Sequence, residues 1–276
     1  MTARWATQWS RVPPVLLVVD IGNTNVVFGI YDDRQLVRTF RFSTVRGRTA
    51  DEHGVLLHQM LTLHGLDTKR VESAILASVV PPLTDVMALA IQHVFGHGPL
   101  IVSPGLDTGI TVVYDNPKDV GADRIVNAVA AYDRVHAGVI VVDFGTATTF
   151  DCVSPKAEYL GGVIVPGIQV SLDALLGNAA KLTRIEIAEA PRVVGQNTTH
   201  AIQSGVVNGY ASLVDGLVDK ITAELGFPCD VIATGGLAAL ISRHTRSVQS
   251  VDEHLTLDGL RILHARNSTR GQTQAS

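Results

Sequence analysis

Two short turns that carry an aspartate recur in the chain, each directly after a run of aliphatic residues. They are Asp20-Ile21-Gly22-Asn23-Thr24-Asn25 and Asp143-Phe144-Gly145-Thr146. In such a turn the glycine permits close backbone approach, and amide N–H groups with Asn or Thr side chains can donate hydrogen bonds to phosphate oxygens. An aspartate would repel that phosphate unless a cation lay between them, so the first turn predicts Mg²⁺ bound together with phosphate. Thr146 is the ligand candidate of the second turn.

The two turns belong to longer segments that resemble each other. Val18-Val19-Asp20-Ile21-Gly22 and Val141-Val142-Asp143-Phe144-Gly145 differ at a single position, and both precede two further strand-like runs. One copy is explained equally well as a turn selected for its geometry. Two copies at matched strand ends favour a binding function and predict an internal duplication of the fold. Thr148 and Thr149, by contrast, are explained by β propensity.

A third candidate site lies at the start of a predicted helix, in Gly121-Ala122-Asp123-Arg124. An aspartate in the first turn of a helix is often structural, because the helix dipole stabilises its charge. The functional alternative is that Asp123 accepts the proton of a substrate hydroxyl while Arg124 binds an anionic group. Phosphoryl transfer asks the protein chiefly for such positioning and charge neutralisation. These residues alone leave both interpretations open.

Other glycine-containing segments are less informative. Gly161-Gly162-Val163-Ile164-Val165-Pro166-Gly167 predicts a strand that enters a helix, with most of its glycines used in a tight turn. Thr234-Gly235-Gly236 offers bare backbone on which an adenosine could lie. The chain contains no Gly-x-x-x-x-Gly-Lys-Ser/Thr segment, which excludes a P-loop, and no Gly-x-Gly-x-x-Gly after a strand, which excludes an ordinary dinucleotide fold.

The elements that position these residues follow from the hydrophobic periodicity. Strands are predicted at 15–21, 26–31 and 35–42, joined by hairpin turns, and helices then alternate with further strands. The same pattern returns at Gly138, so the sequence predicts an α/β protein of two β-β-β-α-β-α-β halves with a ligand cleft between them. The expected parts are a disordered leader (1–14), an N-terminal lobe (15–130), a C-terminal lobe (131–266) and a frayed tail (267–276).

Composition excludes several classes of protein. Among 276 residues, Lys+Arg number 22 and Asp+Glu 26, and the resulting net charge of −4 gives no electrostatic basis for binding nucleic acid or an anionic membrane. No signal peptide or membrane span is indicated. Cys152 and Cys229 are interpreted as buried apolar residues of a cytoplasmic protein. His53, His58 and His64, in one predicted helix, are interpreted as exposed rather than as metal ligands.

Six segments, taken together and in this order, resemble those of type III pantothenate kinases, a family of the actin-like ATPase superfamily. They are Asp20–Asn25, Gly121–Arg124, Asp143–Thr148, Gly161–Gly167, Gly195-Gln196-Asn197-Thr198 and Thr234–Gly236. Each segment alone is moderately specific, whereas the set is highly specific and extends from Val15 to about Arg266. The leader is the one departure, since members of the family usually begin directly with the first strand.

The resemblance implies a duplicated actin-like, ribonuclease H-like fold that phosphorylates pantothenate with ATP, the first step of coenzyme A biosynthesis. It implies contacts to ATP at Asp20, Ile21, Gly22, Asn23, Thr24, Asn25, Val26, Val27 and Thr146. It implies a pantothenate site at Tyr114, Gly121, Ala122, Asp123, Arg124 and Thr198, with Asp123 as the catalytic proton acceptor. Asp143 is similar to the family's ligand for a monovalent cation, K⁺ or NH₄⁺. Thr198 is similar to a residue that reaches the substrate of the neighbouring subunit in a homodimer.

Some alternatives stay open. The apolar stripe of the predicted helix at 202–221 fits either a subunit interface or ordinary core. A kinase or phosphatase of the same superfamily that acts on a sugar or acetate would use the same phosphate turns, although the Gly121–Arg124 and Gly195–Thr198 segments argue against it. A catalytically silent regulator that binds ATP and a protein partner would have no chemical need for Asp20, Asp123 and Asp143 together.

Overall fold

The computed structural model describes residues 14–179 and 185–273. The leader expected at 1–14 therefore lies outside the described residues, except for Pro14. The chain divides into two compact units, of which the first comprises the chain up to Leu106 together with the segment from Leu260, and the second comprises Asp107–Gly259.

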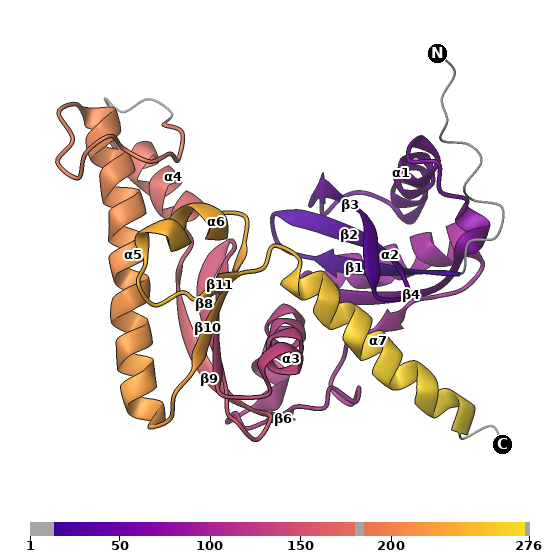
Figure 1. Ribbon diagram of the computed structural model, residues 1–276. Coiled ribbons are helices and arrows are strands. Elements are labelled where there is room, and N and C mark those ends of the chain that lie inside the picture. Colours follow the sequence, from indigo (N-terminus) through magenta and orange to yellow (C-terminus); the bar gives the residue numbers. More distant parts are fainter. Residues whose placement is uncertain (1–13, 180–184, 274–276) are drawn as a thin grey trace, which may run out of the picture. The chain divides into compact units, whose positions relative to one another are not determined.

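A five-stranded sheet forms the centre of the first unit (Figure 1). Its strands lie in the order β3-β2-β1-β4-β5, with β1 antiparallel to β2 and parallel to β4. The elements in chain order are β1 (Val15–Ile21), β2 (Asn25–Asp32), β3 (Gln35–Ser43), α1 (Ala50–Leu63), η1 (Thr68–Arg70), β4 (Val71–Ser78), α2 (Pro81–Phe95) and β5 (Leu100–Ile101). Thr49 and Glu52 form a capping box that begins α1, and proline fits the first turn of α2.

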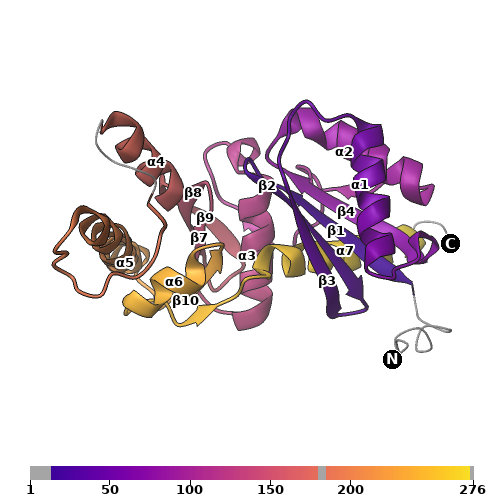
Figure 2. The same cartoon turned by 90° about the horizontal axis from the view of Figure 1, so that it is seen from above.

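Strand alternation gives this sheet two different faces. Leu17, Val19 and Ile21 of β1 belong to the apolar core with residues of α1 and α2, and these two helices lie side by side (Figure 2). Asp20 therefore points to the opposite face. Tyr31 shares that face, because its cross-strand partner is Leu16, and its ring centroid lies 5.8 Å from the guanidinium carbon of Arg261.

The prediction of three exposed histidines in α1 is wrong for His53. His58 and His64 are exposed, but His53 is 2% exposed. It lies four residues before the buried Leu57, which places both side chains on the inward face of the helix. Burial lowers the pKa of His53, so the ring is neutral at physiological pH.

A six-stranded sheet forms the centre of the second unit, in the order β11-β10-β7-β8-β9-β6. The elements are β6 (Thr111–Val112), η2 (Pro117–Asp119), α3 (Ala122–Val135), β7 (Val139–Phe144), β8 (Ala147–Val153), β9 (Glu158–Pro166), α4 (Ile168–Asn178), α5 (Thr198–Leu225), β10 (Asp230–Gly235), α6 (Ala238–Ile241), η3 (Ser242–His244), β11 (Ser250–Val251) and α7 (Leu255–Thr273), of which the last continues into the first unit.

The two sheets repeat one topology. The order β9-β8-β7-β10-β11 corresponds to β3-β2-β1-β4-β5, and in both the first strand is antiparallel to the second and parallel to the fourth. The predicted duplication and α/β fold are therefore confirmed. The second repeat differs in having two helices, α4 and α5, before its fourth strand, and β6 as an additional edge strand.

The two faces of the second sheet also differ. Ile140, Val142 and Phe144 of β7 belong to an apolar core with residues of α5. Asp143 alternates with them and so points to the opposite face, on which α3 packs. Figure 1 shows α5, in orange, and α3 on opposite sides of this sheet.

Helices α3 and α7 explain why the units differ from the expected lobes. The sequence predicts a boundary at 130/131, but the structure divides after Leu106, because α3 follows the first sheet in sequence yet packs on β7 and β8. From Leu260, α7 belongs to the first unit. The tail expected to fray from 267 is helical as far as Thr273. The two helices are equivalent in the duplication, since each follows the fifth strand of one repeat.

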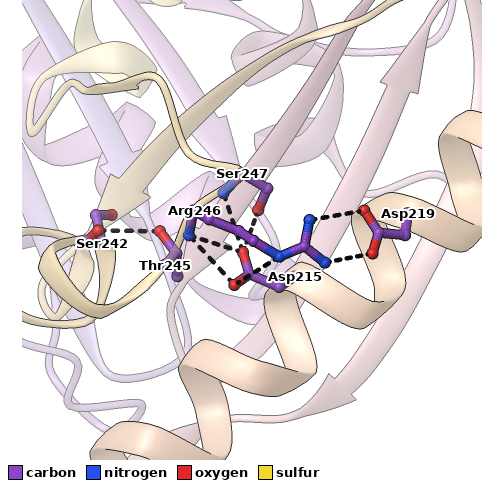
Figure 3. A network of polar contacts seen from close by, with 6 residues as sticks. All are labelled: Asp215, Asp219, Ser242, Thr245, Arg246 and Ser247. Carbon is purple, nitrogen blue, oxygen red and sulfur yellow. Dashed lines mark hydrogen bonds and ion pairs between the residues drawn. The ribbon is translucent and has the colours of Figure 1, made fainter.

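The long helix α5 is tied to the segment between η3 and β11 by charged contacts (Figure 3). Asp215 accepts hydrogen bonds from the backbone amides of Arg246 and Ser247, at 3.1 and 3.0 Å. The guanidinium of Arg246 pairs with Asp219, one turn further along α5. Most of the predicted apolar stripe of α5 is partly buried against the core, and the fully buried apolar side chains lie beside it, at Val207, Ala211, Val214 and Val218.

Both cysteines are free thiols. Cys152 is buried as expected, and burial raises its pKa to about 12, whereas Cys229 is only half-buried. Within the described residues, no helix is both long enough and apolar enough to cross a membrane.

Candidate functional site

The first acidic turn joins β1 to β2. The amide of Gly22 donates to the carbonyl oxygen of Asn25 at 2.9 Å, which closes the turn, and the side chains of Asn23 and Thr24 are exposed at its tip. Asp20 is half-buried near the end of β1. The side chains of Ile21 and Val26 are fully buried, so at these two positions only the backbone can reach a ligand.

Thr44, directly after β3, holds this turn in place. Its hydroxyl donates to the carbonyl oxygen of Gly22 at 2.7 Å, and its amide donates to the carbonyl oxygen of Thr24 at 2.9 Å. The two bonds hold the backbone of the turn, from which the exposed side chains of Asn23 and Thr24 extend. A preorganised set of donors of this kind suits a phosphate group.

The second acidic turn, between β7 and β8, is held in the same way. Gly145 donates its amide to the carbonyl oxygen of Ala147 at 3.0 Å, and Gly167, directly after β9, donates to the carbonyl oxygen of Thr146 at 3.1 Å. The approach is so close that a Cβ on Gly167 would lie 2.2 Å from that carbonyl oxygen. In both repeats, therefore, the residue after the third strand donates its amide to the threonine of the turn.

Asp143 lies on the face of the second sheet that packs against α3. Its Oδ2 accepts a hydrogen bond from Asn127 Nδ2 at 3.1 Å, and Asn127 Oδ1 accepts one from the hydroxyl of Thr256 at 2.7 Å. Burial, together with the charges of Asp123 and Asp151, raises the pKa of Asp143 to about 7. An isolated carboxyl group in this position is poorly stabilised as an anion, which favours the binding of a cation beside it.

Gly235 lies in close contact with Asp143 and Phe144. A Cβ on Gly235 would lie 2.6 Å from Asp143 Oδ1 and 2.6 Å from the carbonyl oxygen of Phe144. A side chain at position 235 would therefore collide with both oxygen atoms, which are of the type that hard cations prefer as ligands. Within the described residues, no group of three or more His, Cys, Asp or Glu side chains could hold a metal ion by itself.

Asp123 and Arg124 lie in the first turn of α3, whose N-cap is Gly121. The backbone amide of Arg124 donates to Asp123 Oδ1 at 2.8 Å. Burial raises the pKa of Asp123, and the amide and positive charge of Arg124 oppose part of that rise. Asn127, four residues after Asp123 on α3, donates to Asp143, so the two candidate carboxylates belong to the same region of the second unit.

The guanidinium of Arg124 is held by a residue that the sequence analysis missed. Arg124 Nε donates to Asp151 Oδ1 at 2.6 Å, and Asp151 is completely buried on β8. The same carboxylate accepts hydrogen bonds from the hydroxyl of Tyr159 at 2.8 Å and from that of Thr149 at 3.0 Å. An aspartate within the apolar end of a strand was the available signal, because a carboxylate is almost never fully buried unless it is paired.

The glycines of β9 make room for this site. We predicted that most glycines of the 161–167 segment form a tight turn, but Gly161 and Gly162 lie within the strand, and only Gly167 lies at the junction with α4. A Cβ on Gly161 would lie 3.2 Å from the ring of Tyr114, and one on Gly162 would lie 3.1 Å from Arg124 Nη2 and 1.7 Å from the carbonyl oxygen of Phe150. Side chains at these positions would displace their neighbours.

The structure thus brings together most of the predicted substrate residues, which are Tyr114, Gly121, Ala122, Asp123 and Arg124. Tyr114 is 40% exposed, and its ring centroid lies 6.4 Å from that of Tyr159. Thr198 is the first residue of α5 and is exposed, and within the described residues it makes no hydrogen bond to Asp123 or Arg124.

Comparison with known proteins identifies the family. A family model described as type III pantothenate kinase matches residues 16–220. The chain belongs to the type III pantothenate kinase family. The type III pantothenate kinase of Myxococcus xanthus (strain DK1622) is 52% identical over 253 residues, which cover 92% of this chain and 99% of that protein. The type III pantothenate kinase of Anaeromyxobacter sp. (strain K) is 53% identical over 253 residues, with coverages of 92% and 100%.

Solved structures support the actin-like fold. MreB 5 of Spiroplasma citri, in a structure bound to AMPPNP, aligns with a TM-score of 0.55 and 10% identity over 95% of this chain and 99% of that chain. Component A of (R)-2-hydroxyglutaryl-CoA dehydratase from Acidaminococcus fermentans aligns with a TM-score of 0.53 and 15% identity over 93% of this chain and 98% of that chain. At these identities the likeness concerns the fold alone.

Proposed function

We propose that this member of the type III pantothenate kinase family transfers the γ-phosphoryl group of ATP to the primary hydroxyl of pantothenate. The product, 4′-phosphopantothenate, is the first intermediate of coenzyme A biosynthesis. The observation that carries the proposal is the placement of Asp123 and Arg124 in the first turn of α3, the helix whose Asn127 donates to Asp143 on β7.

Asp123 is proposed to orient the pantothenate hydroxyl and accept its proton. As the hydroxyl oxygen bonds to phosphorus, the bond from phosphorus to the β,γ-bridging oxygen breaks, ADP leaves, and the proton passes to the Asp123 carboxylate. The raised pKa of Asp123 makes this carboxylate a better proton acceptor than an ordinary aspartate. Arg124 binds the carboxylate of pantothenate, and Tyr114, Gly121 and Ala122 line the same site.

The ATP phosphates are proposed to bind to the turns that follow β1 and β7. Asp20 to Val27 supply backbone amides and the side chains of Asn23, Thr24 and Asn25, and Thr146 supplies its hydroxyl or amide. Mg²⁺ would bind between the phosphates and Asp20, largely through water, as this ion commonly binds nucleotides. The ion would neutralise charge on the transferred group.

A monovalent cation, K⁺ or NH₄⁺, is proposed to bind at Asp143. Asp143 Oδ1 and the carbonyl oxygen of Phe144, which both lie close to Gly235, are oxygen ligands of the kind that such an ion takes. Within the described residues, Asp143 accepts a hydrogen bond from Asn127 and forms no ion pair. A bound cation would keep the Asp143 carboxylate ionised at neutral pH and would add positive charge near the transferred phosphate.

The proposed assembly is a cytoplasmic homodimer in which Thr198 contacts the substrate of the neighbouring subunit. The segment that leads into α5 carries Val193 and Val194, which are 74% and 79% exposed, and so offers apolar surface near Thr198. Apolar surface of this kind suits a subunit interface. Analytical ultracentrifugation, with a Thr198→Ala variant assayed for the Michaelis constant of pantothenate, tests this part of the proposal.

Phosphorylation of pantothenate, followed by mass spectrometry with Mg²⁺ and either K⁺ or Na⁺, tests the proposed reaction. We expect phosphopantothenate to form faster with K⁺ than with Na⁺. Acetate and a panel of hexoses, assayed at the same ATP concentration, serve as the competing substrates. Phosphorylation of acetate or a hexose, without phosphorylation of pantothenate, would show that the proposed substrate is wrong. ATP binding without any phosphorylated product would favour a silent regulator.

A further inference from the structure

Only part of the Arg124 guanidinium forms hydrogen bonds. Its Nε donates to Asp151, but its Nη2 is buried without a hydrogen-bond partner. The side chain retains a 10% exposed fraction. A buried guanidinium N–H group that lacks an acceptor costs free energy, so such a group in a native site calls for an explanation.

Both carboxylate oxygens of Asp151 accept hydrogen bonds. Its Oδ1 receives hydrogen bonds from Arg124 Nε and from the hydroxyl of Tyr159, and its Oδ2 receives one from the hydroxyl of Thr149. These partners come from α3, β9 and β8, so the carboxylate connects three elements of the second unit. The guanidinium of Arg124 also lies over the ring of Tyr159, with its carbon 5.8 Å from the ring centroid. The orientation of Arg124 is therefore fixed from two directions.

We propose that Asp151 is a positioning residue, which fixes the Arg124 guanidinium through Nε so that its terminal nitrogens remain free for the carboxylate of the substrate. The inference rests on the proposed function and extends it, because it states how the chain selects an anionic substrate. A lone arginine would rotate freely, and an arginine whose terminal nitrogens were paired with Asp151 would have no donors left. Pairing through Nε satisfies both requirements.

Gly162 is part of the same arrangement. It pairs with Asp151 across β8 and β9, and a Cβ at this position would lie 3.1 Å from Arg124 Nη2. The absence of a side chain therefore lets Arg124 Nη2 lie close to the strand. Tyr159 completes the arrangement by supplying both a hydroxyl donor to Asp151 and an aromatic face to Arg124.

The test compares pantothenate with panthenol, which has the same reacting hydroxyl but a neutral alcohol in place of the carboxylate. Wild-type protein should prefer pantothenate. In Asp151→Asn, the Michaelis constant for pantothenate should rise about tenfold or more, because a charge-assisted contact present in both the ground state and the transition state is lost. The kcat for pantothenate should change less. The Michaelis constant and kcat for panthenol should hardly change. Tyr159→Phe should produce a smaller shift in the same direction.

Two controls separate positioning from general loss of structure. Tyr132→Phe removes a hydroxyl that donates to the carbonyl oxygen of Pro155, in the same unit, and should leave the preference for pantothenate unchanged. In an Arg124→Ala background, Asp151→Asn should cause no further loss of that preference, since Asp151 acts through Arg124. Circular dichroism and thermal melting of every variant identify those that do not fold.

The inference would be overturned if folded Asp151→Asn and Tyr159→Phe lost equal activity toward pantothenate and toward panthenol. Asp151 would then be a structural residue only. The inference would also be overturned if Asp151→Asn further reduced the preference for pantothenate in the Arg124→Ala background. Binding of both compounds without ATP, measured by isothermal titration calorimetry, separates the two proposals. Wild-type protein that prefers to bind pantothenate but does not phosphorylate it contradicts the proposed function, while the effect of Asp151→Asn on that binding still decides the inference.

Discussion

The amide of Thr44 donates to the carbonyl oxygen of Thr24 at 2.9 Å, and the amide of Gly167 donates to that of Thr146 at 3.1 Å in the corresponding place of the second repeat. In each repeat, the residue directly after the third strand thus supports the turn after the first strand. The duplication preserves the support of the turn as well as the acidic turn itself. Such preservation is expected if both turns bind phosphate, since their backbone donors must be held in place before the ligand arrives.

Removing the Thr44 hydroxyl should weaken ATP binding. Thr44→Val deletes the hydrogen bond to the carbonyl oxygen of Gly22, which is worth about 1 kcal/mol, or roughly a fivefold rise in the Michaelis constant for ATP. The constant for pantothenate should change little. Steady-state kinetics with each substrate varied in turn measures both. Thr39→Val, an exposed change on β3, is the matched control, and an unchanged constant for ATP in Thr44→Val would show that the turn does not depend on this bond.

The pH dependence of the reaction should reflect the raised pKa of Asp123. Burial favours the protonated form of this carboxyl group, so kcat/KM for pantothenate should fall on the acid side at a pH above the ordinary aspartate value of about 3.9. The residual activity of Asp123→Asn should lack this acid limb. Thermal melting over the same pH range excludes acid unfolding as its cause. An identical limb in both proteins would assign the titration to another group.

Asp143 should lower the stability of the ligand-free protein at neutral pH. Its pKa is about 7 in the folded protein but near the ordinary value in the unfolded chain, so the folded state binds more protons between these limits and stability falls as pH rises through them. Asp143→Asn removes this dependence. Without K⁺, the variant should therefore melt at a higher temperature than wild type at pH 8, with a smaller difference at pH 5.5.

Added K⁺ provides the complementary measurement. It should raise the melting temperature of wild type at pH 8, because a cation that binds only the folded state stabilises it, and it should have no such effect on Asp143→Asn. Asp133→Asn, an exposed change on α3, is the matched control. Equal pH dependence of melting in wild type and Asp143→Asn would contradict the burial of a destabilised charge at this position.

The parts of the fold that depend on local sequence were predictable. The β1–β2 and β7–β8 turns are encoded by adjacent residues, and their similarity was enough to predict the duplication confirmed by the two sheets. The place of α3 was not predictable in this way, since that helix follows β5 in sequence but packs on β7 and β8. Chain order alone does not decide against which sheet a helix buries its apolar face.

In the candidate site, too, the contacts between residues far apart in sequence were not predictable. Asp123 and Arg124 stand out by their position at a helix start, whereas Asp151 lies 27 residues from Arg124 and meets it only once α3 packs on the sheet. Tyr159 joins them because a register shift in the pairing of β8 with β9 places it opposite Val153. Partnerships of this kind depend on tertiary packing and strand register, which periodicity does not specify.

The measurement that tests the central claim most directly is the turnover of pantothenate by Asp123→Asn. A positioned proton acceptor contributes about 100-fold or more, so kcat should fall by at least that factor, while ATP binding measured by calorimetry stays close to that of wild type. Asp119→Asn, an exposed change in the neighbouring η2, should keep full activity. Turnover in Asp123→Asn comparable to wild type would remove Asp123 from the reaction and contradict the account.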